Sequence, residues 1–112
     1  MIKLYVASKK LSMAEKDIRV RVTLPAKEND IWLALQKTEM ESIDDCEISD
    51  VECEIEEVDT FLKELFVYDA NIFELNTFAR MLTDMTEEER KAYGRKLKDA
   101  GKISLTKAIY VL

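Results

Sequence analysis

The stretch between residues 39 and 59 most constrains this chain, because it holds eleven acidic residues and no lysine or arginine. Neighbouring carboxylates repel one another even at a wet surface, so such a segment opposes folding unless its charges are spread apart or neutralised. We call these residues the acidic segment; its acids are Glu39, Glu41, Asp44, Asp45, Glu47, Asp50, Glu52, Glu54, Glu56, Glu57 and Asp59. Any fold of this chain must find either space or counter-charges for them.

Charge is divided unevenly along the rest of the chain. Residues 1–38 carry 8 bases and 4 acids, residues 39–89 carry 2 bases and 18 acids, and residues 90–112 carry 7 bases and 1 acid. The basic ends can fold back over the acidic middle, or the acids can face a basic partner. The net charge of -6 disfavours nonspecific adhesion to nucleic acid or anionic lipid. We therefore expect no direct nucleic-acid contact and no membrane contact.

Several residue types that common chemistry needs are absent or scarce. Histidine is missing, which removes the usual general base, the Ser/His and Cys/His nucleophile pairs and the commonest transition-metal ligand. The only glycines are Gly94 and Gly101, so no phosphate-binding or dinucleotide loop can be built. Carboxylates in a line surround no cation, and they lack the contrasting environments that separate two catalytic pKa values. We therefore expect that the chain is not an enzyme, has no catalytic residue and binds no metal or cofactor.

The sequence also favours a reducing compartment. No apolar run approaches the roughly 18 residues that span a bilayer, and the N-terminus lacks the apolar core of a signal peptide. Cys46 and Cys53 are seven residues apart in a predicted strand, so their side chains are expected on opposite faces, unable to pair. These features predict a cytoplasmic protein.

Two strands and a helix are predicted near the N-terminus. Residues 2–7 are typical of a strand, and residues 18–24 alternate strictly between apolar and polar side chains. Pro25 ends the second strand, and residues 27–38 then carry apolar side chains at helical spacing. Trp32 is predicted to lie in the core.

A third strand is predicted from Ser49, where the sequence period returns to two. Its apolar face would carry Val51, Cys53 and Ile55. Alternate side chains on a strand repeat at about 6.6 to 6.8 Å, so the opposite face would form a carboxylate row about 20 Å long. Such a row resembles a run of phosphates. Its members would be Asp50, Glu52, Glu54 and Glu56.

The remainder of the chain is predicted to be helical. Residues 61–66 suggest a short helical turn. The stretch from Asp69 to Asn71 caps a helix with apolar residues at Ile72, Leu75, Phe78, Ala79 and Leu82. Residues 86–89 form a capping box for a helix that buries Tyr93 and Leu97 and ends at Gly101, and Ser104 caps a last helix through Ile109.

Together these elements predict an α+β fold, in which a small antiparallel sheet packs against helices and the C-terminal part is helical. We expect residues 1–112 to form one domain, with an α/β part over residues 1–68 and a helical part over residues 69–112.

Four segments resemble the ArdA antirestriction family, whose members are DNA mimics carried by mobile genetic elements. They are the opening strand at residues 2–7, the Leu-Pro-Ala step at residues 24–26, the acidic strand at residues 47–51, and Asn-Ile-Phe-Glu-Leu-Asn-Thr-Phe-Ala at residues 71–79. The last is the most specific, because the family repeatedly shows a helix of this form. The match covers roughly residues 1–100, whereas family members are typically longer, with a third domain that supports an elongated dimer. The resemblance leaves a homodimer open.

The resemblance implies an inhibitor that occupies the DNA-binding channel of a type I restriction-modification enzyme. The matching segments assign the partner-binding role to Asp44, Asp45, Glu47, Asp50, Glu52 and Glu54, and the charge argument adds Glu56, Glu57 and Asp59. Three alternatives stay open. One is inhibition of another DNA-scanning nuclease with a basic channel, such as an RNA-guided enzyme. Another is a nonenzymatic protein-interaction module with an acidic docking face. The third, against the overall charge, is direct nucleic-acid binding through Arg19, Arg21 and the bases of residues 90–112.

Overall fold

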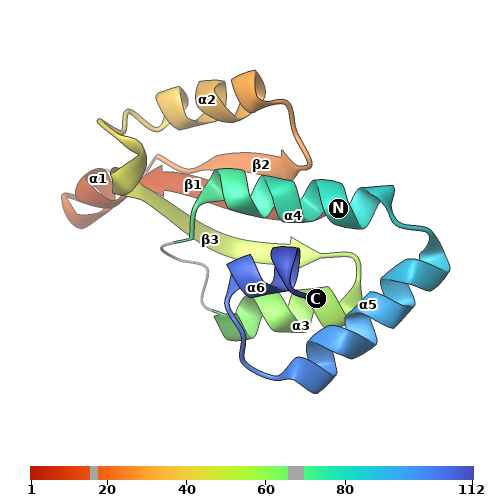
Figure 1. Cartoon of the computed structure of the whole chain (residues 1–112). Coiled ribbons are helices and arrows are strands. Elements are labelled where there is room, and N and C mark those ends of the chain that lie inside the picture. Colours follow the sequence, from red (N-terminus) through yellow and green to blue (C-terminus); the bar gives the residue numbers. More distant parts are fainter. Residues whose placement is uncertain (16–17, 66–69) are drawn as a thin grey trace.

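Ten elements follow one another in the computed structural model, which describes residues 1–15, 18–65 and 70–112 (Figure 1). The α+β fold predicted from the sequence is confirmed. In chain order the elements are β1 (Ile2–Ser8), α1 (Lys9–Met13), β2 (Val20–Leu24), α2 (Glu28–Lys37), the 3-10 helix η1 (Ile43–Asp45), β3 (Cys46–Cys53), α3 (Glu56–Leu65), α4 (Ile72–Asp84), α5 (Glu87–Ala100) and α6 (Leu105–Tyr110).

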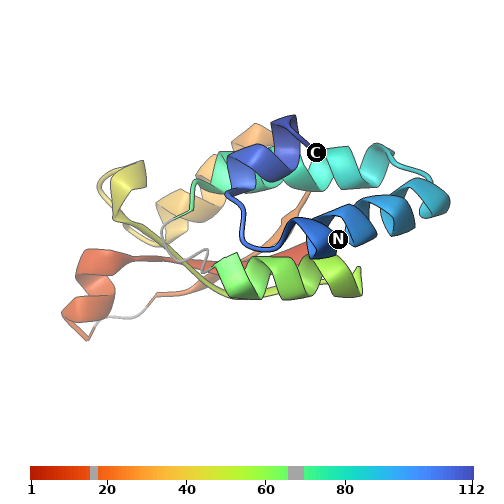
Figure 2. The same ribbon diagram turned by 60° about the horizontal axis from the view of Figure 1, so that its bottom comes forward.

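The three strands form one antiparallel sheet in the order β2-β1-β3. Alternation decides which side of β1 is buried: Ile2, Leu4 and Val6 are inaccessible, whereas Lys3 is exposed and Tyr5 is half-buried. Figure 2 shows α2, α4 and α6 on one side of the sheet, while α3 lies beside β3. The sheet therefore has a core face under the helices and an open face that carries the polar side chains.

Strand β3 departs from simple alternation at Asp50. The pairing of β1 with β3 shifts between Lys3 and Tyr5, and Asp50 has a φ of 50°. This bulge inserts one extra residue, so the buried positions run from Cys46 and Ile48 to Val51. The prediction that the two cysteines face opposite sides is wrong: Cys46 pairs with Ser8 and Cys53 with Ile2, on the core face of β1. They lie at opposite ends of the strand, and both thiols are free.

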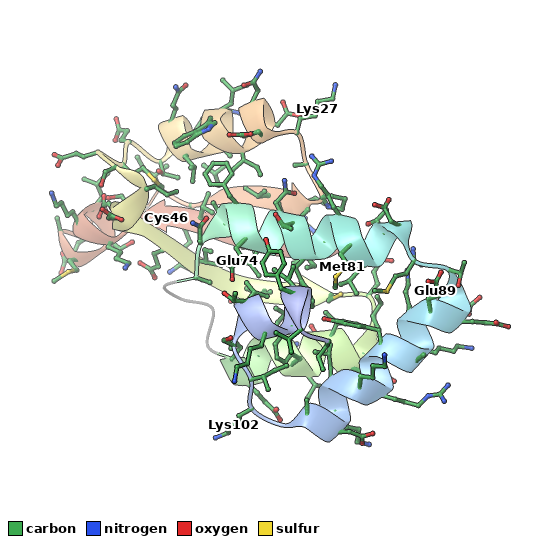
Figure 3. The ribbon with its side chains drawn as sticks, viewed as in Figure 1. Lys27, Cys46, Glu74, Met81, Glu89 and Lys102 are labelled. Atoms are coloured by element: carbon green, nitrogen blue, oxygen red, sulfur yellow. The ribbon has the colours of Figure 1, made fainter. Side chains whose placement is uncertain are left out.

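The predicted helix caps are confirmed. Asn71 accepts a hydrogen bond from the Phe73 amide at 2.8 Å, and Ser104 accepts one from the Lys107 amide at 3.1 Å. Thr86 and Glu89 form the reciprocal capping box of α5, which ends at Gly101 with a φ of 70°. Figure 3 shows Glu89 at the turn into α5 and Lys102 at the far end of that helix. Local sequence therefore determines where the C-terminal helices begin and end.

Two helix predictions need correction. The short turn expected at residues 61–66 is part of a longer helix, because α3 already begins at Glu56; its predicted last residue, Phe66, and Asp69 lie outside the described residues. Trp32 is not in the core: it is 42% exposed on α2, with its ring centroid 5.0 Å from that of Phe73 on α4. The core side of α2 is filled instead by Ile31, Ala34 and Leu35.

Candidate acidic docking surface

Seven of the nine predicted partner-binding acids reach the surface of the described chain. Glu47 is half-buried, and the other six are exposed: Asp44, Asp50, Glu52, Glu54, Glu56 and Glu57. The remaining two, Asp45 and Asp59, are used by the fold. The acidic segment thus has a surface part and a structural part, which charge counting could not separate.

Asp45 is a buried structural carboxylate rather than a surface acid. It accepts a hydrogen bond from the Ser8 hydroxyl and another from the Lys10 amide at 3.0 Å, which joins the end of η1 to the start of α1. Burial by itself would raise the pKa of Asp45, but these hydrogen bonds and the charges of Lys10 and Lys9 hold it below the ordinary value. Only 8% of the residue is accessible, so Asp45 does not lie on the surface where a partner-binding acid was expected.

Asp59 holds the end of β3. One of its oxygens accepts the Cys53 amide at 2.9 Å, and the other accepts the Lys63 ammonium at 2.8 Å, one helical turn further along α3. The hydrogen bond from Lys63 is the main reason that the pKa of Asp59 lies below its ordinary value. Asp59 is half-buried and committed to the strand-to-helix connection, so it contributes little to an external surface.

The predicted straight row of four carboxylates does not form. Asp50 sits on the bulge, Glu52 is on β3, Glu54 follows the strand, and Glu56 begins α3. The strand ends at Cys53 because the chain turns there, with the Glu54 amide bonded to the Met1 carbonyl at 3.3 Å. The exposed acids therefore follow a bent path from the open face of the sheet to the first turn of α3.

Bases from the N-terminal third reach this path across the open face. Arg19 Nη1 lies 3.4 Å from Ser49 Oγ and 3.7 Å from the Asp50 carboxylate. Since β1 separates β2 from β3, the Arg19 side chain must pass over β1, where Ala7 is only 2% accessible. Two further ion pairs join Lys10 to Glu41 at 2.9 Å and the N-terminal ammonium to Glu54 at 3.7 Å. The chain therefore supplies counter-charges to several acids at the edge of this path.

A groove between α3 and α5 brings the acidic segment close to the basic C-terminal part. It encloses about 600 Å³, with Phe61 and Leu97 among its lining residues, Glu56, Glu57 and Glu64 from α3, and Arg95 and Lys98 from α5. The helices approach closely at Gly94, where an added Cβ would lie 3.1 Å from Glu57 Cβ. Helix α5 thus places positive charge opposite the acids of α3, as folding back of the basic end would require.

The most specific segment of the resemblance has a structural role. The Asn76 side chain accepts the Ala26 amide at 2.8 Å and donates to the Ala26 carbonyl at 3.0 Å, and Arg80 donates to the same carbonyl at 2.7 Å. Residues 71–79 therefore hold residues 24–26 in place, where the Leu24-Pro25 peptide is cis. These two segments belong to the scaffold and contain none of the predicted partner-binding acids. Their contact with each other explains why both occur in one chain, and the sequence alone does not indicate that contact.

No family model matches the chain, and neither the curated proteins nor the solved structures include a match to it. Among residues 1–15, 18–65 and 70–112, no cluster of three or more potential ligands could hold a metal ion. In the same part of the chain, no helix combines the length and apolar character needed to cross a membrane. The site must therefore be interpreted from its own geometry and charge.

Proposed function

We propose that this chain is a nonenzymatic inhibitor that mimics DNA and occupies the basic DNA-binding channel of a type I restriction-modification enzyme. The observation that carries the proposal is the bent path of exposed acids, Asp50, Glu52, Glu54, Glu56 and Glu57, which runs from the sheet onto α3. A protein that binds DNA through lysine and arginine recognises the positions of negative charges. A surface of carboxylates can therefore compete with DNA for its binding site. The proposal also places the chain in the cytoplasm.

The ion pairs on this surface are compatible with such competition. The pairs made by Arg19 and the N-terminus use side chains that stay largely in solvent at the acidic partner, with Asp50 at 69% and Glu54 at 72% exposure. Exposed ion pairs contribute little to stability, because water and salt screen them. A partner's arginine or lysine can therefore replace an internal base at small cost. Docking would need no refolding of β3 or α3.

The same surface would fit the basic channel of an RNA-guided nuclease, which also holds duplexes through their backbones. The surface charge of the chain is compatible with both enzyme classes and does not distinguish between them. The restriction enzyme is preferred because the four segments described above resemble an antirestriction family.

A second candidate is supported by the groove between α3 and α5. There the acids Glu56, Glu57 and Glu64 face Arg95 and Lys98 of the same chain. In this alternative the acidic segment mainly neutralises the basic ends, and the domain is an interaction module for a basic partner unrelated to DNA. The two candidates differ in what loss of the carboxylates does to stability.

The deciding experiment titrates the chain into a complex of labelled duplex DNA with a type I restriction-modification enzyme and follows release of the duplex. The test variant carries Glu52→Gln, Glu54→Gln and Glu56→Gln. A matched control carries Asp84→Asn, Glu88→Gln and Asp99→Asn, which remove the same charge from exposed positions elsewhere. Both variants are unfolded in urea alongside the wild type.

Mimicry predicts that the wild type and the control displace the duplex, less strongly as salt rises, whereas the test variant does not and remains as stable as the wild type. Internal neutralisation predicts that the test variant loses stability and that no protein displaces DNA. Absence of displacement by the folded wild type at low salt would contradict the proposed target. Repeating the titration with an RNA-guided nuclease then tests the other enzyme class.

A further inference from the structure

Helix α2 carries two adjacent exposed apolar side chains, Trp32 and Leu33, that the proposed function leaves unused. Leu33 is 54% exposed and Trp32 is 42% exposed, although both belong to a helix whose other apolar residues are buried. Trp32 leans against the ring of Phe73, which extends the patch onto α4. In Figure 1, α2 lies at one edge of the fold. Contiguous exposed apolar side chains mark interaction surfaces, and tryptophan is enriched among the residues that carry most of the binding energy there.

The exposed side chains of α2 carry opposite charges at the two ends of the helix. Acidic residues occupy the first turn, at Glu28 and Asp30, and Lys37 occupies the last turn. Between these charged ends lie Asn29, Trp32, Leu33 and Gln36, all exposed. The face is therefore negative at its start, apolar in the middle and positive at its end.

Such a face is complementary to an antiparallel copy of itself. A two-fold axis passing between Trp32 and Leu33 would place Trp32 beside Leu33 of a second copy, with the amides of Asn29 and Gln36 on either side. The same axis would place Glu28 beside Lys37 of the second copy, twice. Each copy presents the same patch, as an isologous interface requires, and the two helix dipoles run in opposite directions.

We propose that two copies of this chain associate through α2, with antiparallel helices and the contact centred on Trp32 and Leu33. One helix per copy makes a small interface, so the dimer is expected to be weak and concentration-dependent. The association does not depend on the proposed inhibitor function, because α2 and the acidic path from Asp50 to Glu57 are different surfaces. It would present two acidic surfaces in one assembly.

The chain contains its own reporter for this contact, since Trp32 is the only tryptophan. Sedimentation velocity over a concentration series at low salt measures the mass, and the emission maximum of Trp32 measures burial of the patch. Dimerisation through α2 predicts that the emission shifts to shorter wavelength over the same concentrations at which the mass doubles.

Leu33→Glu places two like charges at the two-fold axis and is expected to weaken the dimer at least about tenfold without unfolding an exposed position. Val111→Glu is the matched control: it adds the same charge at a residue that is 75% exposed beyond α6. A sharper test uses Glu28→Lys and Lys37→Glu as separate variants. Each alone would place like charges together at both ends, whereas an equal mixture restores both pairs of opposite charge as a heterodimer.

The proposal is overturned if the wild type stays monomeric throughout the series. It is also overturned if a dimer forms that Leu33→Glu leaves intact, or if the mixture of charge variants associates no better than either variant alone. Circular dichroism of every variant verifies that a loss of association is not a loss of folding.

Discussion

The two edge strands of the sheet, β2 and β3, pair with the same central strand but differ in how sequence relates to structure. In β2 the alternation is unbroken: Val22 and Leu24 are buried, and Arg21 and Thr23 are exposed. In β3 the bulge at Asp50 shifts the alternation by one residue, and the strand ends three residues before the predicted row does. A period of two therefore assigns faces only as far as the register is uninterrupted.

The strands also differ in what surrounds them. β3 is held at both ends by carboxylates, through Asp45 before its first residue and Asp59 at the Cys53 amide. β2 is followed directly by Pro25, and the Ala26 backbone is held by the neutral side chain of Asn76. Acids in β3 and its flanks therefore serve the fold as well as the surface. Four experiments test this contrast.

The largest effect is expected where the two strands are alike, on the core face. Ile48→Ala in β3 and Leu24→Ala in β2 each remove a fully buried side chain, so each should lower the free energy of unfolding by about 2–5 kcal/mol. Thr23→Ala on the open face should change it by less than about 0.5 kcal/mol. Urea unfolding measures all three. A small effect of Ile48→Ala alone would mean that β3 does not pack as β2 does.

The next largest effect should separate the strands at the bulge. Asp50→Val puts a β-branched residue at a φ of 50°, and the left-handed conformation costs about 1–2 kcal/mol for most residues, so unfolding free energy should fall by that amount. Asp50→Gly should escape this penalty. Asp50→Asn removes the charge facing Arg19 but tolerates the backbone, and Arg21→Val tests a regular position of β2. Equal effects of valine at positions 50 and 21 would contradict the bulge.

As the pH falls, amide protection at the ends of β3 should decrease before protection in β2 does. The pKa values of Asp45 and Asp59 are lowered by folding, so each carboxylate contributes stability above the unfolded value of 3.8, and that stability is lost as pH falls through the folded pKa. Amide hydrogen exchange from neutral pH down to about pH 3 should show earlier loss of protection in β3. Asp59→Asn should flatten this pH dependence at Cys53, whereas Asp44→Asn at an exposed position should leave it unchanged.

The smallest effect concerns thiol reactivity. Burial raises the pKa of Cys46 to about 11 and also raises that of the half-buried Cys53, so few thiolates exist near neutral pH. Both native thiols should react slowly with an alkylating reagent in the folded chain and rapidly in urea. A cysteine placed on the open face of β2, Thr23→Cys, should react at the rate of a free thiol. Rapid labelling of Cys46 would place it outside the core.

Sequence reasoning succeeded where one local signal decides the outcome. The capping residues Asn71, Thr86 and Ser104 begin their helices as predicted, because each cap is completed within three residues of the same chain segment. It failed at Trp32, since helical spacing alone does not say how wide the buried stripe of α2 is. The burial of Asp45 could not be predicted from local sequence either, because its partners Ser8 and Lys10 are about 35 residues away in sequence.

The α+β composition, the helix caps and the presence of a segment with eleven acids and no base all follow from the amino-acid sequence alone. These properties depend on periodicity, on short-range hydrogen bonds and on counting. Which acids reach the surface depends on tertiary contacts: the bulge at Asp50, Arg19 crossing β1, and α5 packing against α3. Pairing between distant segments is set by the packing of the whole core, which no local pattern in the chain records.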